Sequence, residues 1–249
     1  MKLSVYFTPL GLTPAVVTGK TVVVLDVLRA TTTIVAAVAN GAKAVLPTAS
    51  SEEALKVAQN FDRKERLLAG ERRCIRIPGF DLGNSPLEMT AEAVAGRSVI
   101  LSTTNGTPAL VAADAGRPVI VGAVTNFSAA AEAAREAAAE QDELVVICAG
   151  KEKFFALEDA YVAGRFAKVA LAGRGRGKRS HQLNDGAVAA IELVRHYGSD
   201  WTRAIMASAA ARDLLALKFK ADVVAASEVD RYDIVPIYRD RRVTVPTRG

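Results

Sequence analysis

The sequence has 249 residues but only two cysteines and two histidines, which excludes several classes of protein at the outset. Cys74 and Cys148 cannot form a disulfide framework, and no cysteine or histidine pair has the spacing of zinc ligands. The longest uncharged apolar stretch, residues 30–42, is shorter than the ~20 residues that a membrane-spanning helix needs. The first residues show no signal-peptide pattern. We therefore expect a cytoplasmic protein without a membrane partner.

Aromatic residues are also scarce, at 6% of the chain, and the net charge is +5. The positive charge favours anionic ligands without identifying them. The Arg/Gly segment at 173–179, which we expect to be an exposed loop, suggests a nucleic-acid binder as an alternative. That segment contains no aromatic residue on which a base would stack, so a small anionic ligand is favoured over nucleic acid. The sequence leaves homo-oligomerisation open.

The hydrophobic half of the sequence is arranged as short β-branched runs that alternate with alanine-rich segments of helical length. This alternation is typical of strands buried between layers of helices, so we predict an α/β fold. A single unit over 1–249 is expected, with tentative halves 1–125 and 126–249. The predicted strands are 3–7, 21–26, 44–47, 66–69, 98–102, 119–122 and 144–148. The predicted helices are 32–40, 51–60, 85–94, 107–115, 126–140, 157–172, 185–197 and 199–217.

Local signals indicate where some of these helices begin and end. Ser85 and Glu88 have the spacing of a capping box, with a proline between them at the first helical position. Thr107 followed by a proline predicts another helix start, and Gly41 predicts a left-handed helix stop. After residue 217 we expect a further helix and one or two edge strands.

The first polar segment of interest follows the strand at 21–26 and contains Asp26, Arg29 and three threonines at 31–33. Ligands of open α/β sheets bind beyond the carboxyl ends of the strands, so this segment suits an anionic ligand together with a cation. The alternative is structural: Asp26 caps the helix, Arg29 pairs with a surface carboxylate and the threonines pack.

Two further strands run into polar loops of the same kind. Residues 102–107 combine small hydroxyl side chains with a glycine, which leaves backbone N–H groups uncovered for a phosphate or forms only an Asn-Gly turn. After the strand at 144–148, Glu158 and Asp159 either hold a hard cation or complement a helix macrodipole. Cys148 has no histidine nearby in the sequence, which favours a small buried thiol over a nucleophile.

A fourth segment, residues 79–86, places two glycines, a carboxylate, an amide and a hydroxyl directly before a predicted helix. Such a composition builds a rigid polar loop, and loops of this kind often bind ligands. An elaborate turn and cap is the structural alternative.

These segments occur together, in this order, in one known family. The sequence resembles the 2-phosphosulfolactate phosphatase (ComB) family from about residue 3 to residue 236. The resemblance rests on six motifs at 26–33, 69–72, 79–86, 104–107, 148–150 and 157–159. It implies an α/β/α sandwich with the site in a cleft and a Mg²⁺-dependent phosphatase that converts 2-phospho-3-sulfolactate to 3-sulfolactate, a step of coenzyme M biosynthesis. This chain departs from the family at 151–156 and in its longer 173–179 loop, so another small phosphorylated acid remains an alternative substrate.

The resemblance and the residue types together give a set of candidate site residues. The candidate catalytic residues are Asp26, Arg29, Glu71, Arg72 and Asp81. The candidate substrate-binding residues are Thr31, Thr32, Asn84, Ser85, Thr104, Asn105, Gly106, Thr107, Cys148 and Gly150. The candidate metal ligands are Asp26, Asp81, Glu158 and Asp159.

The sequence does not decide what attacks phosphorus. Asp26 lacks the second aspartate, two residues later, that many aspartyl phosphatases use, because Leu28 occupies that position. Water activated by a metal and a carboxylate is therefore slightly favoured over a phosphoaspartate.

Overall fold

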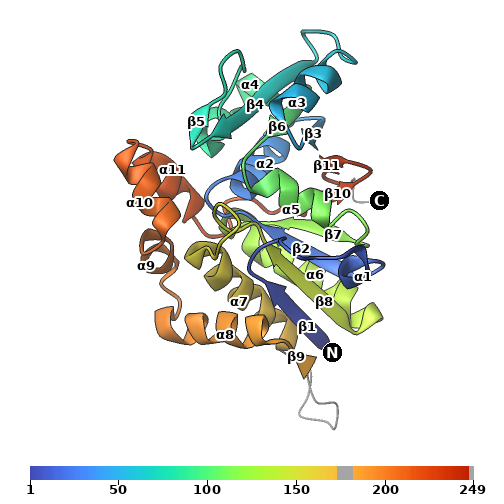
Figure 1. The fold of residues 1–249 in the computed structure, drawn as a ribbon, viewed down its shortest axis with the longest axis vertical. Helices are drawn as coiled ribbons and strands as arrows, with labels where there is room; N and C mark the ends of the chain where they lie inside the picture. Colours follow the sequence, from blue (N-terminus) through green and yellow to red (C-terminus); the bar gives the residue numbers. More distant parts are fainter. Residues whose placement is uncertain (173–181, 247–249) are drawn as a thin grey trace.

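The computed structural model describes residues 1–172 and 182–246. Within them, eleven strands form one mixed sheet of order β5-β4-β6-β3-β11-β10-β7-β2-β8-β1-β9 (Figure 1). In chain order the strands are β1 Lys2–Tyr6, β2 Thr21–Leu25, β3 Ala44–Pro47, β4 Arg66–Arg72, β5 Ile75–Arg76, β6 Ser98–Ser102, β7 Val119–Gly122, β8 Glu143–Cys148, β9 Gln182–Leu183, β10 Ile237–Arg239 and β11 Arg242–Thr244. All seven strands predicted from the sequence are present, with their ends shifted by three residues or fewer.

Helices cover both faces of this sheet. They are α1 Pro14–Val17, α2 Ala30–Ala39, α3 Ser51–Ala58, α4 Ala91–Val94, α5 Gly106–Ala112, α6 Phe127–Gln141, α7 Leu157–Leu171, α8 Asp185–Tyr197, α9 Trp201–Met206, α10 Ala209–Ala216 and α11 Lys220–Ala226. Val23 and Leu25 pack with α6 and α7, whereas Val22 and Val24 pack with α2 and α5. Because alternate residues of β2 are buried on opposite faces, the strand is apolar from Val22 to Leu25. The predicted α/β layered class is confirmed.

The parallel strands fall into two groups, β4-β6-β3 and β7-β2-β8-β1-β9. A C-terminal hairpin joins them, since β10 pairs antiparallel with β7 and β11 pairs antiparallel with β3. Asp240 and Arg241, at its turn, have positive φ angles of 50° and 59°, as a two-residue hairpin turn requires. The expectation of edge strands here was wrong, because the hairpin fills the middle of the sheet. The tentative halves, 1–125 and 126–249, stay a prediction.

Two predicted helices are broken in the structure. The segment 85–94 contains only a 3₁₀ turn, η1 Pro86–Glu88, followed by α4. The predicted capping box is wrong: the Ser85 hydroxyl accepts from the Leu87 N–H at 3.2 Å, and the Glu88 carboxylate accepts from the Gly83 N–H instead. The segment 199–217 forms α9 and α10, because the Ser208 hydroxyl caps a new helix by accepting from the Ala211 N–H at 3.0 Å.

Other helix boundaries follow the sequence more closely. Gly41 has a φ of 91° and ends α2, as predicted. The predicted start at Thr107 is one residue late, because α5 begins at Gly106. The Thr107 hydroxyl donates to the Thr103 carbonyl, which lies before the helix, at 3.0 Å. Within the described residues, no helix combines the length and apolarity that crossing a membrane requires. The 173–179 segment lies outside the described residues.

Candidate active site

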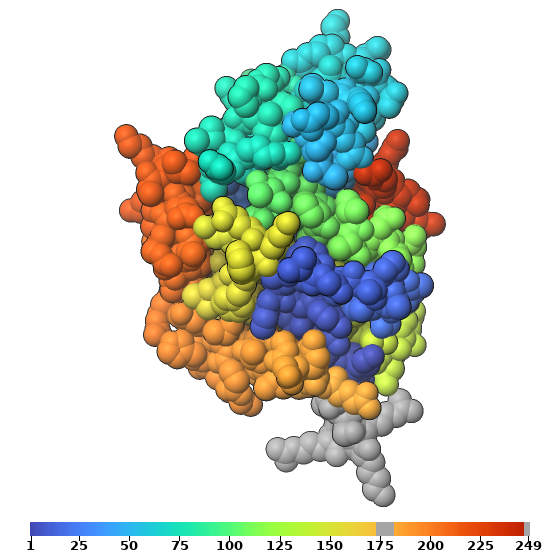
Figure 2. All heavy atoms as spheres, viewed as in Figure 1, coloured from blue at the N-terminus to red at the C-terminus, as the bar shows by residue number. Residues whose placement is uncertain are grey.

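A pocket of about 340 Å³ opens where the loops after β2, β6 and β8 meet the turn between β4 and β5. In Figure 2 the molecule is hollowed there, between the β4–β5 hairpin, the α10–α11 segment and the loop after β8. This is the expected place for a ligand in a sheet of this type, beyond the carboxyl ends of parallel strands. The side chains and backbone that line it belong to Asp26, Leu28, Arg29, Glu71, Arg73, Cys74, Asn84, Thr104, Asn105, Lys151, Glu152, Asp213, Ala216 and Leu217.

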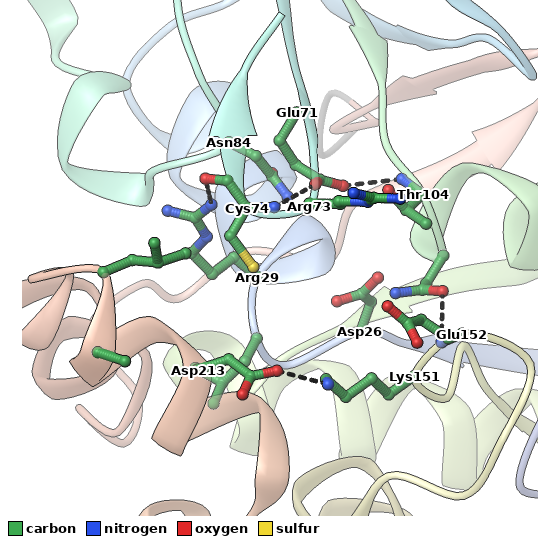
Figure 3. A pocket seen from close by; sticks show the side chains of 14 residues that line it. Asp26, Arg29, Glu71, Arg73, Cys74, Asn84, Thr104, Lys151, Glu152 and Asp213 are labelled. Atoms are coloured by element: carbon green, nitrogen blue, oxygen red, sulfur yellow. Dashed lines mark hydrogen bonds and ion pairs between the residues drawn. The ribbon is translucent and has the colours of Figure 1, made fainter.

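Asp26 directly follows β2, and its side chain lies in the centre of the pocket in Figure 3. Its Oδ1 accepts a hydrogen bond from the Ala30 N–H at 3.1 Å, so the predicted helix-capping contact is present. Burial, supported by the negative charges of Glu71 and Glu158, raises the pKa of Asp26 to about 7. A carboxyl group with that pKa exchanges a proton near neutral pH, which is what general acid–base catalysis needs.

Gly106 allows the loop after β6 to approach Asp26 closely. A Cβ atom at this position would lie 2.7 Å from Asp26 Oδ2 and 2.4 Å from the Ala30 Cβ, closer than atoms can pack. The strands β6 and β2 are separated by four others in the sheet, yet α5 leads back over β2 and brings this loop to Asp26. A residue without a side chain is therefore required for the two loops to share one pocket.

Arg29 is buried, and its charge is balanced by a carboxylate from a distant part of the chain. Its Nη1 donates to Asp222 Oδ2 at 2.6 Å, and its Nη2 donates to the Cys74 carbonyl at 2.8 Å. The guanidinium also lies over the Phe219 ring, 4.6 Å from the ring centre. The alternative of a surface ion pair is wrong, because Asp222 is itself only 3% exposed.

Glu71 ties the β4–β5 turn to the loop after β6. Its Oε2 accepts from the Cys74 N–H at 2.7 Å, and its Oε1 accepts from the Thr104 N–H at 2.8 Å. Both oxygens are thus committed to backbone donors, which fits a structural carboxylate. The turn itself is tight, with φ angles of 52° at Arg73 and 66° at Cys74, and it places both of these residues on the pocket wall.

The structure directs Arg72 and Asp81 away from the pocket. Arg72 donates from Nη2 to the Ser102 hydroxyl at 2.9 Å, and the adjacent Arg73 takes the pocket position instead. Asp81 accepts from the Leu68 N–H at 2.8 Å and pairs with Arg63 at 2.5 Å. The predicted Arg72 and Asp81 are thus not brought together with Asp26.

The residues behind the loop after β8 form a buried polar layer. Asp159 accepts from the Val27 N–H at 2.8 Å and from the Gly150 N–H at 3.1 Å, so it joins the loops after β2 and β8. Burial, supported by the charges of Glu158 and Asp26, raises the pKa of Asp159 well above its usual range. Burial also raises the pKa of Glu158, whose Oε2 is buried without a hydrogen-bond partner within the described residues.

Cys148, at the end of β8, is fully buried, as the sequence suggested. Burial, followed by the charge of Asp159, raises the pKa of its thiol well above the usual value, which disfavours the nucleophilic thiolate. Burial also raises the pKa of Cys74 at the pocket wall. Neither thiol therefore has the character of a nucleophile.

Most of the predicted hydroxyl residues brace the loops rather than face the pocket. The Thr31 and Thr32 hydroxyls donate to the Asp26 and Val27 carbonyls at 2.9 and 2.8 Å. Ser85 donates to Asp222 Oδ1 at 2.8 Å. In contrast, Asn84, Thr104 and Asn105 line the pocket, and Asn84 Oδ1 is buried without a hydrogen-bond partner within the described residues.

The loop after β8 supplies two charged side chains, Lys151 and Glu152. Lys151 pairs with Asp213 of α10 at 2.5 Å, and this contact raises the pKa of the lysine. The Glu152 N–H donates to Asn105 Oδ1 at 3.0 Å, which holds the loops after β6 and β8 together. In the view of Figure 3, Asp26 lies between this loop and the turn that carries Glu71 and Arg73.

Comparison with known sequences identifies the relatives of this chain. The sequence model of the 2-phosphosulpholactate phosphatase family matches residues 6–241. The chain belongs to this family. It is 41% identical over 221 residues to a protein of Thermus thermophilus and 40% identical over 214 residues to one of Deinococcus radiodurans, each named probable 2-phosphosulfolactate phosphatase. The alignments cover 88% of both chains in the first case, and 86% of this chain and 85% of its relative in the second.

In this member of the phosphatase family, sequence reasoning missed a consistent group of pocket residues. Four of them lie directly beside a motif that the sequence analysis had singled out: Arg73, Cys74, Lys151 and Glu152. Their position next to these motifs was the only signal that could have identified them. Asp213 and Leu217 carry no such signal, because α10 reaches the pocket only through the packing of the C-terminal helices.

The donor groups of the pocket are compatible with magnesium held largely by substrate and water. Among the described residues, no group of three or more histidine, cysteine, aspartate or glutamate side chains is arranged to hold a metal ion. Mg²⁺ commonly needs only one or two carboxylates, with waters and phosphate oxygens as its other ligands. Asp26 meets that need, because burial and the nearby carboxylates Glu71 and Glu158 disfavour its negative charge, which a divalent cation would offset.

Proposed function

We propose that the chain hydrolyses 2-phospho-3-sulfolactate to 3-sulfolactate and phosphate, as a step of coenzyme M biosynthesis. One observation carries the proposal: a pocket of about 340 Å³ combines the Asp26 carboxyl group with three cationic side chains, from Arg29, Arg73 and Lys151. The substrate carries a phosphate, a carboxylate and a sulfonate, so it needs several cations around one reacting centre. Membership of the 2-phosphosulpholactate phosphatase family and the names of the two relatives support the same activity.

Positioning and charge neutralisation dominate the hydrolysis of phosphate monoesters. Arg29 and Arg73 bind oxygens of the anionic groups, and the planar guanidinium suits two parallel hydrogen bonds to one group. Asp26 accepts a proton from the attacking water, since its carboxyl group lies at the centre of the pocket. The water oxygen bonds to phosphorus, the ester P–O bond breaks, and the leaving oxygen of sulfolactate takes up a proton from solvent.

The chemistry of this pocket also supports magnesium dependence as part of the proposal. One oxygen of Asp26 would hold the ion, which leaves the other to accept the proton. Asn84 Oδ1, without a hydrogen-bond partner within the described residues, is a further oxygen donor at the same pocket. When bound, Mg²⁺ neutralises charge on the phosphoryl oxygens. The other predicted ligands have less support: Asp81 lies outside the pocket, and both oxygens of Asp159 accept backbone hydrogen bonds.

The decisive experiment is a phosphate-release screen with and without Mg²⁺. Its substrates are phosphosulfolactate, phospholactate, phosphoglycerate and common monoesters. We expect release from phosphosulfolactate that stops with EDTA and returns with added Mg²⁺. Preference for another phosphorylated acid would show that the proposed substrate is wrong. Unchanged phosphate release in EDTA would show that the activity does not depend on Mg²⁺. No release from any compound would overturn the enzyme proposal.

A second experiment concerns the attacking group. In a single turnover in ¹⁸O-water, attack by water on phosphorus puts the label directly into phosphate, as we expect. A trapped phosphoaspartate at Asp26 would show the covalent route instead.

The proposal extends to the cellular setting. A small phosphorylated acid is a metabolite, so we place the enzyme in the cytoplasm, acting on a diffusible substrate and not on nucleic acid. Fractionation of cells that produce the chain would test the location, and light scattering of the purified protein would test for a homo-oligomer.

A further inference from the structure

Asp222 of α11 makes two hydrogen bonds with parts of the chain that are far from it in sequence. Its Oδ2 accepts from Arg29 Nη1 at 2.6 Å, and its Oδ1 accepts from the Ser85 hydroxyl at 2.8 Å. The carboxylate is 3% exposed and Arg29 is equally buried. Asp222 does not line the pocket itself but lies behind a residue that does.

The contacts of Arg29 leave part of its guanidinium available to a ligand. Within the described residues it donates one hydrogen bond to Asp222 and one to the Cys74 carbonyl, whereas a guanidinium has five N–H donors. The Phe219 ring, 4.6 Å from the guanidinium carbon, packs against it. These contacts fix the plane of the group, and Arg29 lines the pocket although its side chain is only 2% exposed.

We infer that Asp222 is a positioning residue, which holds the Arg29 guanidinium in the orientation that binds the phosphoryl or sulfonate oxygens of the substrate. The inference rests on the proposed function for the identity of the anion. A free arginine side chain samples many rotamers, and fixing it when the anion binds would cost affinity. Asp222 fixes it beforehand and also balances its buried charge.

The carboxylate is not needed merely to dock α11 on the body of the protein. Val223 of α11 and Leu214 of α10 are both buried in the same hydrophobic core as the sheet, so apolar packing holds this segment. A positioning role and a docking role therefore predict different results when Arg29 is absent.

The test is a double-mutant cycle with Asp222→Asn, Arg29→Met and the double variant. Titration calorimetry with inorganic phosphate measures anion binding, and phosphate release from phosphosulfolactate measures kcat and KM. Asp222→Asn is expected to weaken phosphate binding and to lower kcat/KM by about tenfold to hundredfold, as loss of a supporting partner commonly does. In the Arg29→Met background the same change is expected to have no further effect on either quantity. In the Arg29→Met background, Asp222→Asn should also raise the melting temperature, because it removes a buried carboxylate that has lost its cationic partner.

Two control variants sharpen the cycle. Asp230→Asn removes another carboxylate of the C-terminal region, one that caps α6 by accepting from the Ser128 N–H and lies outside the pocket. It is expected to leave phosphate binding unchanged. If Asp222→Asn does not fold, Ser85→Ala replaces it in the cycle, with an expected weakening of about twofold to fivefold that again requires Arg29.

An equal loss of phosphate binding in both backgrounds would overturn the inference in favour of docking. Unchanged binding in folded Asp222→Asn would overturn it as well. Failure of the proposed function would look different: wild-type protein would release no phosphate from phosphosulfolactate, while the binding cycle would still report on Asp222.

Discussion

The pocket has two sides that are built in different ways. The floor consists of the loops after β2, β6 and β8, whose polar groups bond mainly to backbone within these loops, as Asp159 does to the Val27 and Gly150 N–H groups. The arch consists of the β4–β5 turn and the α10–α11 segment. Its contacts are long-range: Arg29 of the floor meets Asp222 across 193 residues of sequence. The floor thus supplies the Asp26 carboxyl group and two cations, Arg29 and Lys151, whereas the arch supplies Arg73 and the carboxylates that pair with those two cations.

The largest expected effect concerns the floor. Asp26→Asn should lower kcat by about 10²–10⁴-fold, because an amide cannot accept a proton from the attacking water. The fold should persist, since the amide oxygen can still accept from the Ala30 N–H. Steady-state phosphate release and circular dichroism check the two parts. More than about a tenth of wild-type activity in the variant would remove Asp26 from the catalytic group.

Where floor and arch meet, Arg29→Lys should lower kcat/KM by about 10²-fold or more, comparable to the loss of a donor that stabilises transition-state charge. Lysine keeps the charge but not the planar fork that contacts Asp222, Cys74 and the ligand together. Steady-state kinetics measure the loss. Unchanged kinetics would mean that Arg29 has only a structural role.

Neighbouring arginines in the arch provide a matched pair. Arg73→Ala should raise KM by about tenfold, because it removes one rim cation that faces the substrate. Arg72→Ala should leave KM near the wild-type value and lower the free energy of unfolding by about 1 kcal/mol, since it loses its hydrogen bond to Ser102. Kinetics and urea unfolding of both variants test the contrast. A raised KM in Arg72→Ala together with an unchanged KM in Arg73→Ala would show that Arg72, and not Arg73, contacts the substrate.

Asp26, in the floor, should also affect how the free energy of unfolding depends on pH. The pKa of Asp26 is about 7 in the folded protein and near 3.8 when unfolded, so its carboxyl group is protonated in both states below about pH 4. Between these values unfolding releases a proton, and this group's contribution to stability is lost as pH rises towards 7, by up to about 4 kcal/mol. Urea unfolding of wild type and Asp26→Asn in EDTA, from pH 4 to 8, measures it. Parallel pH profiles for the two proteins would contradict the prediction.

The smallest effect is expected at the margin between the two sides. Lys151→Met should raise KM by about threefold to fivefold with kcat little changed, because this partly exposed lysine is already paired with Asp213. KM should also rise with added salt more steeply in wild type than in the variant. A large fall in kcat would instead place Lys151 in contact with the reacting atoms.

The sequence predicted the floor better than the arch. Asp26, Thr104 and Asn105 lie within three residues of the ends of buried strands, so the strand pattern alone placed them at one edge of the sheet. Asp213 and Asp222 lie in helices whose sequence carries no ligand signal, and only tertiary packing brings them to the pocket. Asp81 is an error of the opposite kind, a residue that was predicted to belong to the site but does not. Its carboxylate pairs with Arg63 outside the pocket.

The sequence by itself determined the layered α/β class, the buried strands and the polar loops at their carboxyl ends, because the apolar strand pattern and the local turn chemistry depend on neighbouring residues. The tertiary structure decided the rest. It inserted the C-terminal hairpin between β3 and β7, and it chose Arg73 over Arg72 for the pocket. It also paired Arg29 with Asp222. These outcomes depend on which distant segments pack together, and no local pattern carries that information.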